Sequence, residues 1–385
     1  MAKITFVNGY VFRNESETFE KSNVVCENGY VVSVGNDIPS DSEIVDLGGK
    51  YLIPGLIDVH THGIGGHDFN YANKEQVKKM RMSYAKAGTT SVMATYASQT
   101  PEKLVEYIKE ANENRNANDG YANLIGIHIE GRYLNPIKKG AHSERLLANP
   151  TIDELNMLLE VMEPSPMHFS LAPELEGAEM FIKEIKKHGG TVGIAHTNAT
   201  YEESMKAIEW GASSFTHTFN AMTSVHHRMP GATVCAMTCD EAYAEVISDG
   251  EHLHPAIVNL IYKSKPCDKM VLITDSMAAT GEPDGQYSIA GSPVTVINGK
   301  AIILPSGTIA GSTLTMFKAI NNMMHFCDLP LEKVIKYATV NPASMVGAKS
   351  LGKIEEGYTA DFIVIKDKTA PEIDSVYVGA KKLEV

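Results

Sequence analysis

Two histidines, His60 and His62, stand two residues apart at the end of an apolar run that is rich in β-branched residues. In a β-strand, side chains at positions i and i+2 point to the same face, so both imidazoles would lie on one side of the chain. Two imidazoles held in this way supply half of the ligands of a divalent-metal site. The following Gly63, Gly65 and Gly66 suit a turn whose backbone passes close to another group. The pair indicates little by itself, because histidines with ordinary core or surface partners are common.

Further candidate ligands end other apolar runs later in the chain. They are Glu130 after NLIGIHI, His196 after TVGIA, His217 after SSFT and Asp275 after KMVLIT. Burying so many polar groups without a metal ion or mutual pairing is costly, so the set is difficult to explain as structure alone. Imidazoles and carboxylates bind Zn²⁺ or Fe²⁺ and leave coordination positions open. We therefore predict a centre for one or two divalent ions, with the candidate ligands His60, His62, Glu130, His196, His217 and Asp275.

The chemistry that suits such a centre is hydrolysis. A bound ion lowers the pKa of a water molecule to about 7 and polarises a carbonyl oxygen. One carboxylate must then act as general base toward the water and as general acid toward the leaving group. We expect Asp275, which stands alone at the end of the last apolar run, to have this catalytic role.

The runs that carry these residues belong to a regular alternation of strand-like and helix-like segments. Eight strand candidates occur at 52–62, 90–96, 123–130, 168–172, 191–196, 213–217, 243–248 and 269–275. Helical candidates between them occur at 74–87, 101–114, 152–163, 178–188 and 202–210. Eight alternations predict a (β/α)₈ TIM barrel, in which the active site forms at the C-terminal ends of the strands. The candidate ligands should therefore meet at one end of the barrel.

The two ends of the chain differ from this pattern. Residues 1–50 read as short strands with hairpin signals at Asn8-Gly9 and Asn28-Gly29, and residues 340–385 return to short strands. We expect these two segments to form one small, discontinuous β-sandwich domain beside a barrel of residues 51–339. A β-like insertion near 285–308, with a turn at Asn298-Gly299, precedes helical candidates at 314–327 and 331–338.

The composition of the chain indicates which binding partners and which cellular compartment to expect. The formal net charge of −13 argues against a broad surface for nucleic acid or anionic membranes, so an anionic ligand would need a local cationic pocket. The five cysteines, an odd number without a framework spacing, favour reduced thiols. The first residues do not resemble a signal peptide, and no apolar run approaches transmembrane length. A cytoplasmic protein is expected.

Several motifs, in combination and order, resemble the amidohydrolase superfamily, and more closely the N-acetylglucosamine-6-phosphate deacetylases. They are GLIDVHTHG, HIEGRYLNPIKKGAH, AHTNAT, THTFNAM, HHRMPG, SDGEHLHP and LITDSMAATG, with LGKIEEGYTADFIVI near the end. The resemblance covers nearly the whole chain. It implies a metal-dependent enzyme of amino-sugar catabolism that hydrolyses the acetamide of N-acetylglucosamine 6-phosphate to glucosamine 6-phosphate and acetate.

The resemblance also implies roles for single residues. Glu130, His196 and His217 match the principal metal ligands of the family, and Asp275 matches the catalytic acid and base. His60 and His62 match positions that are histidines only in members with a second metal ion, which Glu130 would then bridge. Positions that contact the substrate match His142, Asn220, Ala221, Arg228 and His252.

Two of these assignments concern the phosphate group and assembly. Asn220 and Ala221 match a phosphate-binding turn. Arg228 matches a phosphate-binding arginine that comes from the partner subunit, which implies a homodimer; without the resemblance, a surface arginine is the simpler interpretation. In the motif that begins at Glu130, Arg132 replaces the family's usual proline. Arg132 could pair with an acidic residue or add contacts to an anionic substrate.

Three alternatives to this function stay open. One is N-acetylgalactosamine-6-phosphate deacetylation, which differs in the orientation of one sugar hydroxyl. A second is a cyclic amidase such as dihydroorotase, although these enzymes usually carry a carboxylated lysine where Glu130 stands here. The third is a non-catalytic scaffold with the same fold, against which the presence of all six candidate residues argues.

Overall fold

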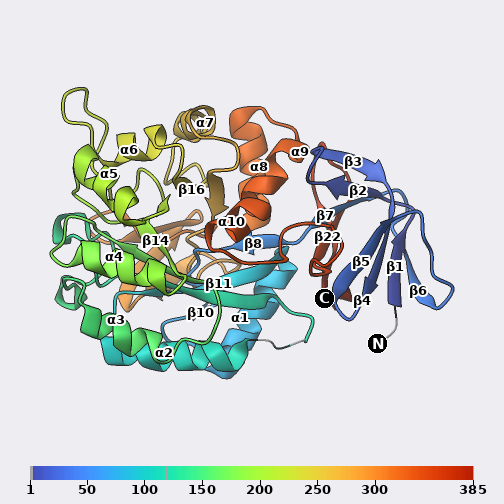
Figure 1. The fold of residues 1–385 in the computed structure, drawn as a ribbon, viewed down its shortest axis with the longest axis horizontal. Coiled ribbons are helices and arrows are strands. Elements are labelled where there is room, and N and C mark those ends of the chain that lie inside the picture. The colour runs from blue at the N-terminus through green and yellow to red at the C-terminus, as the bar shows by residue number, and fades with distance from the viewer. Residues whose placement is uncertain (1–2, 116, 118, 385) are drawn as a thin grey trace.

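An eight-stranded parallel sheet forms the centre of the computed structural model, which describes residues 3–115, 117 and 119–384 (Figure 1). The strands are β8 (Leu56–Asp58), β11 (Thr89–Ala97), β12 (Asn123–Glu130), β13 (Met167–Leu171), β14 (Thr191–Ile194), β15 (Ser214–Phe215), β16 (Tyr243–Ile247) and β17 (Met270–Ile273). They pair in this sequence order, each parallel to the next. Backbone hydrogen bonds from the N–H of Asp275 to the carbonyl of His60, 2.9 Å, and from the N–H of His62 to the carbonyl of Ser276, 2.8 Å, join the ends of β17 and β8. The predicted TIM barrel is confirmed.

A helix follows each barrel strand and covers the outside of the sheet (Figure 1). The helices are α1 (Lys74–Lys86), α2 (Pro101–Asn114), α3 (Ile152–Leu159), α4 (Ala178–Lys187), α5 (Tyr201–Trp210), α6 (Ala232–Thr238), α7 (Pro255–Ser264) and α8 (Met316–Cys327). After α8 come α9 (Leu331–Val334), the 3₁₀ turn Ile335–Ala338 and α10 (Val340–Met345). Their apolar faces pack against the strands in two buried clusters, and Phe181 of α4 and Phe169 of β13 belong to the first of these.

Two further sheets, built from both chain ends, lie beside the barrel (Figure 1). One contains β5 (Tyr30–Gly35), β4 (Asn23–Glu27), β1 (Lys3–Val7) and β6 (Ser42–Asp46). The other contains β24 (Lys381–Lys382), β23 (Ile373–Val378), β22 (Phe362–Ile365), β7 (Tyr51–Pro54), β2 (Tyr10–Arg13) and β3 (Thr18–Lys21). Phe6 of the first sheet packs edge-on against Phe362 of the second, so the two sheets enclose one core.

The expected strand 52–62 is wrong as a single element. Residues up to Pro54 pair with β2 and β22, whereas β8 pairs with β11 of the barrel. Gly55 allows the change of sheet, because a Cβ at this position would lie 2.0 Å from Oγ1 of Thr90. The chain therefore enters the barrel at Leu56.

The turns were predicted with mixed success. Asn28-Gly29 joins β4 to β5, and Asn298-Gly299 joins β19 (Ser292–Ile297) to β20 (Lys300–Ile303), both as antiparallel hairpins. Asn8-Gly9 does not form a hairpin, because β1 and β2 belong to different sheets. This turn is instead the corner between the two layers.

Three helices, α6, α7 and α10, lie where the sequence predicts none. Helix α10 falls within residues 340–385 but contacts β8 and β17 of the barrel. The division of the chain into domains stays an interpretation. The insertion after β17 is a sheet of β18 (Gly285–Ile289), β19, β20 and β21 (Thr308–Ile309), and a short hairpin of β9 (Gly63–Ile64) and β10 (His67–Asp68) follows β8. No helix in the described ranges is long and apolar enough to cross a membrane.

Candidate metal centre and substrate pocket

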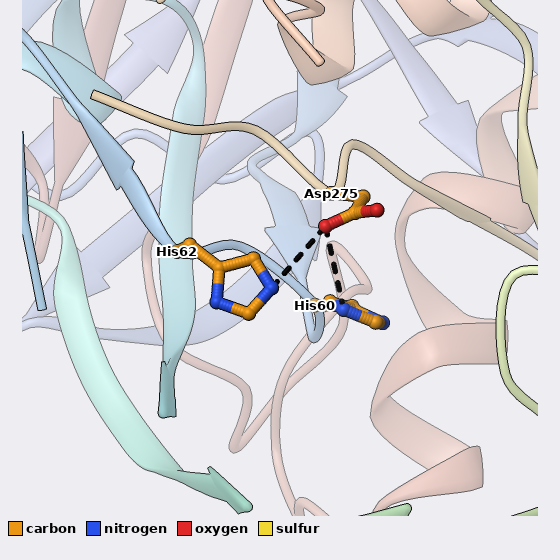
Figure 2. A group of neighbouring side chains, drawn as sticks. All are labelled: His60, His62 and Asp275. Atoms are coloured by element: carbon orange, nitrogen blue, oxygen red, sulfur yellow. Dashed lines mark ion pairs between the residues drawn. The ribbon is translucent and has the colours of Figure 1, made fainter. Parts of the chain in front are cut away.

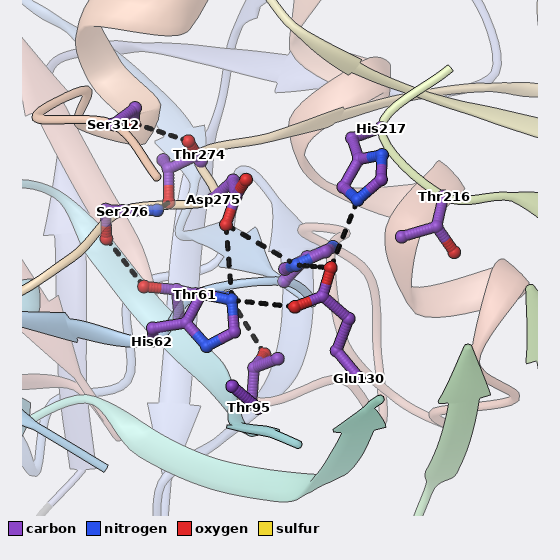
Figure 3. A network of polar contacts seen from close by, with 12 residues as sticks. Thr61, His62, Thr95, Glu130, Thr216, His217, Thr274, Asp275, Ser276 and Ser312 are labelled. Carbon is purple, nitrogen blue, oxygen red and sulfur yellow. Dashed lines mark hydrogen bonds and ion pairs between the residues drawn. The ribbon is translucent and has the colours of Figure 1, made fainter. Parts of the chain in front are cut away.

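The six candidate ligands converge at the C-terminal end of the barrel. Figure 3 shows four of them, His62, Glu130, His217 and Asp275. Glu130 is the last residue of β12, and His60 and His62 stand two and four residues beyond the end of β8. His196, His217 and Asp275 each stand two residues beyond their strands and have left-handed backbone angles, with φ of 42°, 32° and 48°. Non-glycine residues rarely adopt this conformation, and such strain is concentrated at functional sites.

Glu130 lies at the middle of the cluster (Figure 3). Its Oε1 is 3.1 Å from Nε2 of His217 and 3.5 Å from Nε2 of His196. Its Oε2 is 3.0 Å from Nε2 of His62 and 3.6 Å from Nε2 of His142. One carboxylate therefore faces both halves of the cluster, as a bridging ligand must.

Asp275 forms the second group with His60 and His62 (Figure 2). Its Oδ1 is 3.3 Å from Nε2 of His62 and 3.6 Å from Nε2 of His60. The Asp275 side chain is 12% exposed and lines the pocket above the cluster. It can therefore reach both a bound ion and a substrate.

The carboxylates dominate the electrostatics of the cluster. Burial alone would lower the pKa of His62, but hydrogen bonding and charge from Asp275 and Glu130 outweigh it and raise the pKa to about 10. Burial would likewise lower the pKa of His60, yet the charges of Glu130 and Asp275 hold it well above its usual value. For Glu130, burial acts to raise the pKa, but the surrounding imidazoles keep it well below the usual range. The cluster thus stabilises added positive charge, as protons or as divalent cations.

The donor set fits divalent ions. Within the described residues, two triads place their ligand atoms within 4.8 Å of one another: His60, His62 and Asp275, and Glu130, His142 and His196. Nε2 of His60 is buried and has no hydrogen-bond partner, which is costly unless a further group binds it. Nδ1 of His196 lies 2.6 Å from the carbonyl oxygen of Lys138, so that nitrogen donates and Nε2 is left free to bind an ion.

A pocket of about 410 Å³ opens above the cluster. Four of the five expected substrate residues line it, namely His142, Asn220, Ala221 and His252. Two of these imidazoles are fixed from behind: Nδ1 of His142 by Oγ of Ser98 at 2.8 Å, and Nδ1 of His252 by Oδ2 of Asp249 at 2.7 Å. The insertion supplies part of an apolar wall through Ile289 and Ile309.

Arg228, the fifth expected substrate residue, does not line this pocket. It is exposed on the loop between β15 and α6, next to Met229, whose side chain is 73% exposed. Among the residues that the structure describes, nothing therefore brings its guanidinium to the site. Its role stays a prediction that depends on a second subunit.

Arg132 faces away from the pocket. Its guanidinium binds Glu154 of α3 at 3.0 and 3.1 Å. Of the two possibilities that the sequence leaves open, the structure shows pairing with an acidic residue.

Sequence reasoning missed two residues. Lys138 lines the pocket, and its Nζ lies 3.0 Å from the carbonyl oxygen of Met222, beside Asn220 and Ala221. Glu245 is fully buried on β16 behind His60. The signal for Glu245 is an acidic residue in the otherwise apolar strand YAEVI, where only a buried partner can justify a charge.

Comparison with known proteins places this arrangement among characterised enzymes. A model of the amidohydrolase family matches residues 51–383. N-acetylglucosamine-6-phosphate deacetylase of Lysinibacillus sphaericus is 30% identical over 92% of each chain. N-acetylgalactosamine-6-phosphate deacetylase of Escherichia coli is 32% identical and aligns with 85% of this chain and 86% of its own.

Two solved structures are similar in fold to this chain along its whole length. That of N-acetylglucosamine-6-phosphate deacetylase from Pasteurella multocida has a TM-score of 0.91 at 27% identity, covering 99% of both chains. An aspartate-to-alanine mutant of the Mycobacterium smegmatis enzyme, in complex with N-acetyl-D-glucosamine-6-phosphate, has a TM-score of 0.89 at 30% identity, covering 100% of this chain and 99% of that one.

Proposed function

This chain belongs to the amidohydrolase family, and we propose that it hydrolyses the acetamide of N-acetylglucosamine 6-phosphate to glucosamine 6-phosphate and acetate. The observation that carries the proposal is the position of Glu130, which faces five imidazoles at the floor of a pocket lined by His142, Asn220 and His252. The relatives with this function align along nearly the whole chain. The reaction belongs to amino-sugar catabolism.

Two divalent ions, zinc or iron, would occupy the cluster. One would be held by His60, His62 and Asp275, the other by His196 and His217, with Glu130 between them. Such ions supply a water molecule of lowered pKa and polarise the acetyl carbonyl when bound.

Asp275 would carry the proton. Burial acts to raise its pKa, but His60 and His62 outweigh this and lower it, so the carboxylate is ionised and able to accept a proton. It would take a proton from the attacking water and return it to the sugar nitrogen, because the amine leaves poorly without it. His142 and His252, each fixed by a second residue, would orient the sugar and the acetyl group.

The phosphate group would lie at the opposite end of the pocket, near Asn220, Ala221 and Lys138. A local cation is needed there, because the chain as a whole carries a net charge of −13. In a homodimer, Arg228 of one subunit would complete the pocket of the other. The five free thiols fit a reducing compartment, and we place the enzyme in the cytoplasm.

N-acetylgalactosamine 6-phosphate is a second candidate substrate, because a relative with that activity is 32% identical. The deciding experiment measures acetate release from both epimers, using enzyme stripped of metal and then reloaded with Zn²⁺ or Fe²⁺. We expect metal-dependent release with a higher kcat/KM for the glucosamine epimer. A preference for the galactosamine epimer would make N-acetylgalactosamine 6-phosphate the assigned substrate. Absence of acetate release from both epimers would favour the interpretation of a non-catalytic scaffold.

A further inference from the structure

Glu245 lies beneath the metal cluster, inside the barrel. Its side chain is fully buried on β16. Oε2 is 3.2 Å from Nδ1 of His60 and 3.2 Å from the backbone nitrogen of His217. One carboxylate oxygen therefore contacts two candidate ligands that come from different strands, β8 and β15.

The contact with His60 decides which ring nitrogen faces the cluster. A carboxylate oxygen only accepts, so Nδ1 of His60 carries the hydrogen and donates it. Nε2 then keeps its lone pair and points toward Glu130 and Asp275, each 3.6 Å away. This is the arrangement in which a carboxylate behind a histidine orients the ring and increases its basicity toward a metal ion.

The contact with His217 acts on the backbone. His217 has a φ of 32°, which a non-glycine residue keeps only when its surroundings hold it. Its N–H donates to Glu245, and the neighbouring Thr218 N–H donates to the Glu245 carbonyl at 2.9 Å. The strained turn that presents His217 is thus attached to β16 by two successive backbone N–H groups, those of His217 and Thr218.

We propose that Glu245 is a positioning residue of the two-ion centre, which aligns His60 and His217 so that both halves of the cluster bind their ions. This inference rests on the proposed metal-dependent function. The competing explanation is purely structural: Glu245 balances charge in the barrel interior, where its Oε1 lies 3.6 Å from Nε2 of His168. If the role is purely structural, replacing Glu245 would lower the free energy of unfolding but leave the metal affinity of the folded protein unchanged.

The test titrates Zn²⁺ into three metal-free proteins: wild type, Glu245→Gln and Ser170→Ala. Titration calorimetry measures the heat of binding, and elemental analysis measures the metal bound per chain. Glutamine preserves shape and removes the charge behind His60. Ser170 is an apt control because it is fully buried in the same interior and its hydroxyl bonds His128 and Thr216, both at 2.8 Å, rather than a candidate ligand. We expect Glu245→Gln to lower the affinity for at least one ion by about 10–100-fold. Ser170→Ala should bind Zn²⁺ as wild type does.

The outcomes separate the two proposals. Wild type that binds no Zn²⁺ would overturn the proposed metal-dependent function. Wild type that binds two ions, with unchanged affinities in folded Glu245→Gln, would overturn the positioning role alone. If Glu245→Gln does not fold, a crystal structure of Zn²⁺-loaded wild type decides. It must show His60 bound through Nε2 with Nδ1 still on Glu245, and binding through Nδ1 would contradict the inference.

Discussion

Arg132 and Glu154 form a two-point ion pair, with Nε 3.0 Å from Oε2 and Nη2 3.1 Å from Oε1. The remaining Nη1 lies 3.3 Å from the carbonyl oxygen of Gln99 and 3.4 Å from that of Leu146. Arg132 therefore joins the loop after β11, the start of α3 and the segment that carries His142. We therefore expect Arg132 to affect a substrate only indirectly, through the placement of that segment.

Replacing Arg132 by lysine should loosen this segment while preserving the charge. Lysine cannot reproduce the planar fork that binds Glu154 at two points. We expect kcat/KM to fall roughly tenfold, equal to about 1.4 kcal/mol, with unchanged metal content. Arg145→Lys, at an exposed position of the same segment, is the control and should behave as wild type. Equal kinetics for both variants would contradict a clamping role.

The number of ions follows from the number of ligands. His60, His62, Glu130, His196 and His217 exceed the needs of one tetrahedral ion. Protein purified without chelator should contain more than one equivalent of metal per chain by elemental analysis. The double variant His60→Asn, His62→Asn should retain at most one. Values at or below one equivalent in wild type, even after metal loading, would reduce the centre to Glu130, His196 and His217.

If Arg228 of one subunit completes the pocket of the other, two impaired variants should restore activity when their subunits are mixed. Arg228→Ala should raise KM for the phosphorylated sugar, and Asp275→Asn should abolish turnover. In mixed dimers, one pocket would combine an intact Asp275 with an intact Arg228 of the partner subunit. Activity should therefore recover on mixing, as measured by acetate release after subunit exchange verified by mass spectrometry. Failure to recover despite exchange would count against a shared phosphate site.

The sequence predicted the convergence of the candidate ligands better than the path of the chain. Each candidate ligand ends an apolar run, and parallel strands bring such ends together, so Glu130 and His217 meet although 87 positions separate them. The residues of a strand and its immediate neighbours in the sequence do not determine which sheet that strand joins. Pro54 and Leu56 are both apolar and buried, yet they lie in different sheets, because Thr90 packs where a side chain at residue 55 would stand.

The orientation of charged side chains was equally hidden. Arg132 does not line the pocket, and its guanidinium pairs instead with Glu154, a partner 22 positions away. Glu245 is meaningful only once β16 lies beside the strand that presents His217. Both depend on tertiary contacts that no spacing within one strand reveals.

Asp361 should make stability depend on pH. Burial raises its pKa to about 6 from an ordinary 3.8, against opposing hydrogen bonds from Gly379, Thr359 and Asn123. The folded state therefore holds this proton more tightly than the unfolded chain. The resulting stabilisation is complete below pH 3.8 and is lost as the pH rises through about 6.

The measurement compares the free energy of unfolding of wild type and Asp361→Asn from pH 4 to pH 8. Asparagine is neutral throughout, so this one contribution disappears from the variant. Wild type should lose up to about 3 kcal/mol relative to the variant across this range. Parallel curves would show that Asp361 has the same pKa in the folded and unfolded states.

Asp275→Asn is the sharpest test of the proposed mechanism. Asparagine keeps the shape of the side chain and its place 3.3 Å from His62, but it cannot accept a proton. Loss of a general acid or base costs about 10²–10⁴-fold, and one residue would serve both steps here, so we expect the upper end of that range in kcat. Binding of the sugar phosphate should largely survive, since the pocket walls are unchanged. Asp58→Asn is the comparison variant, because Asp58 is a buried carboxyl group on the neighbouring strand that lies outside the pocket. It accepts hydrogen bonds from the Thr274 hydroxyl and from the backbone N–H of His60. Metal content must be measured in both variants, because Asp275 also faces an ion position. If fully metal-loaded Asp275→Asn hydrolyses the acetamide within a few-fold of wild type, another group carries the proton.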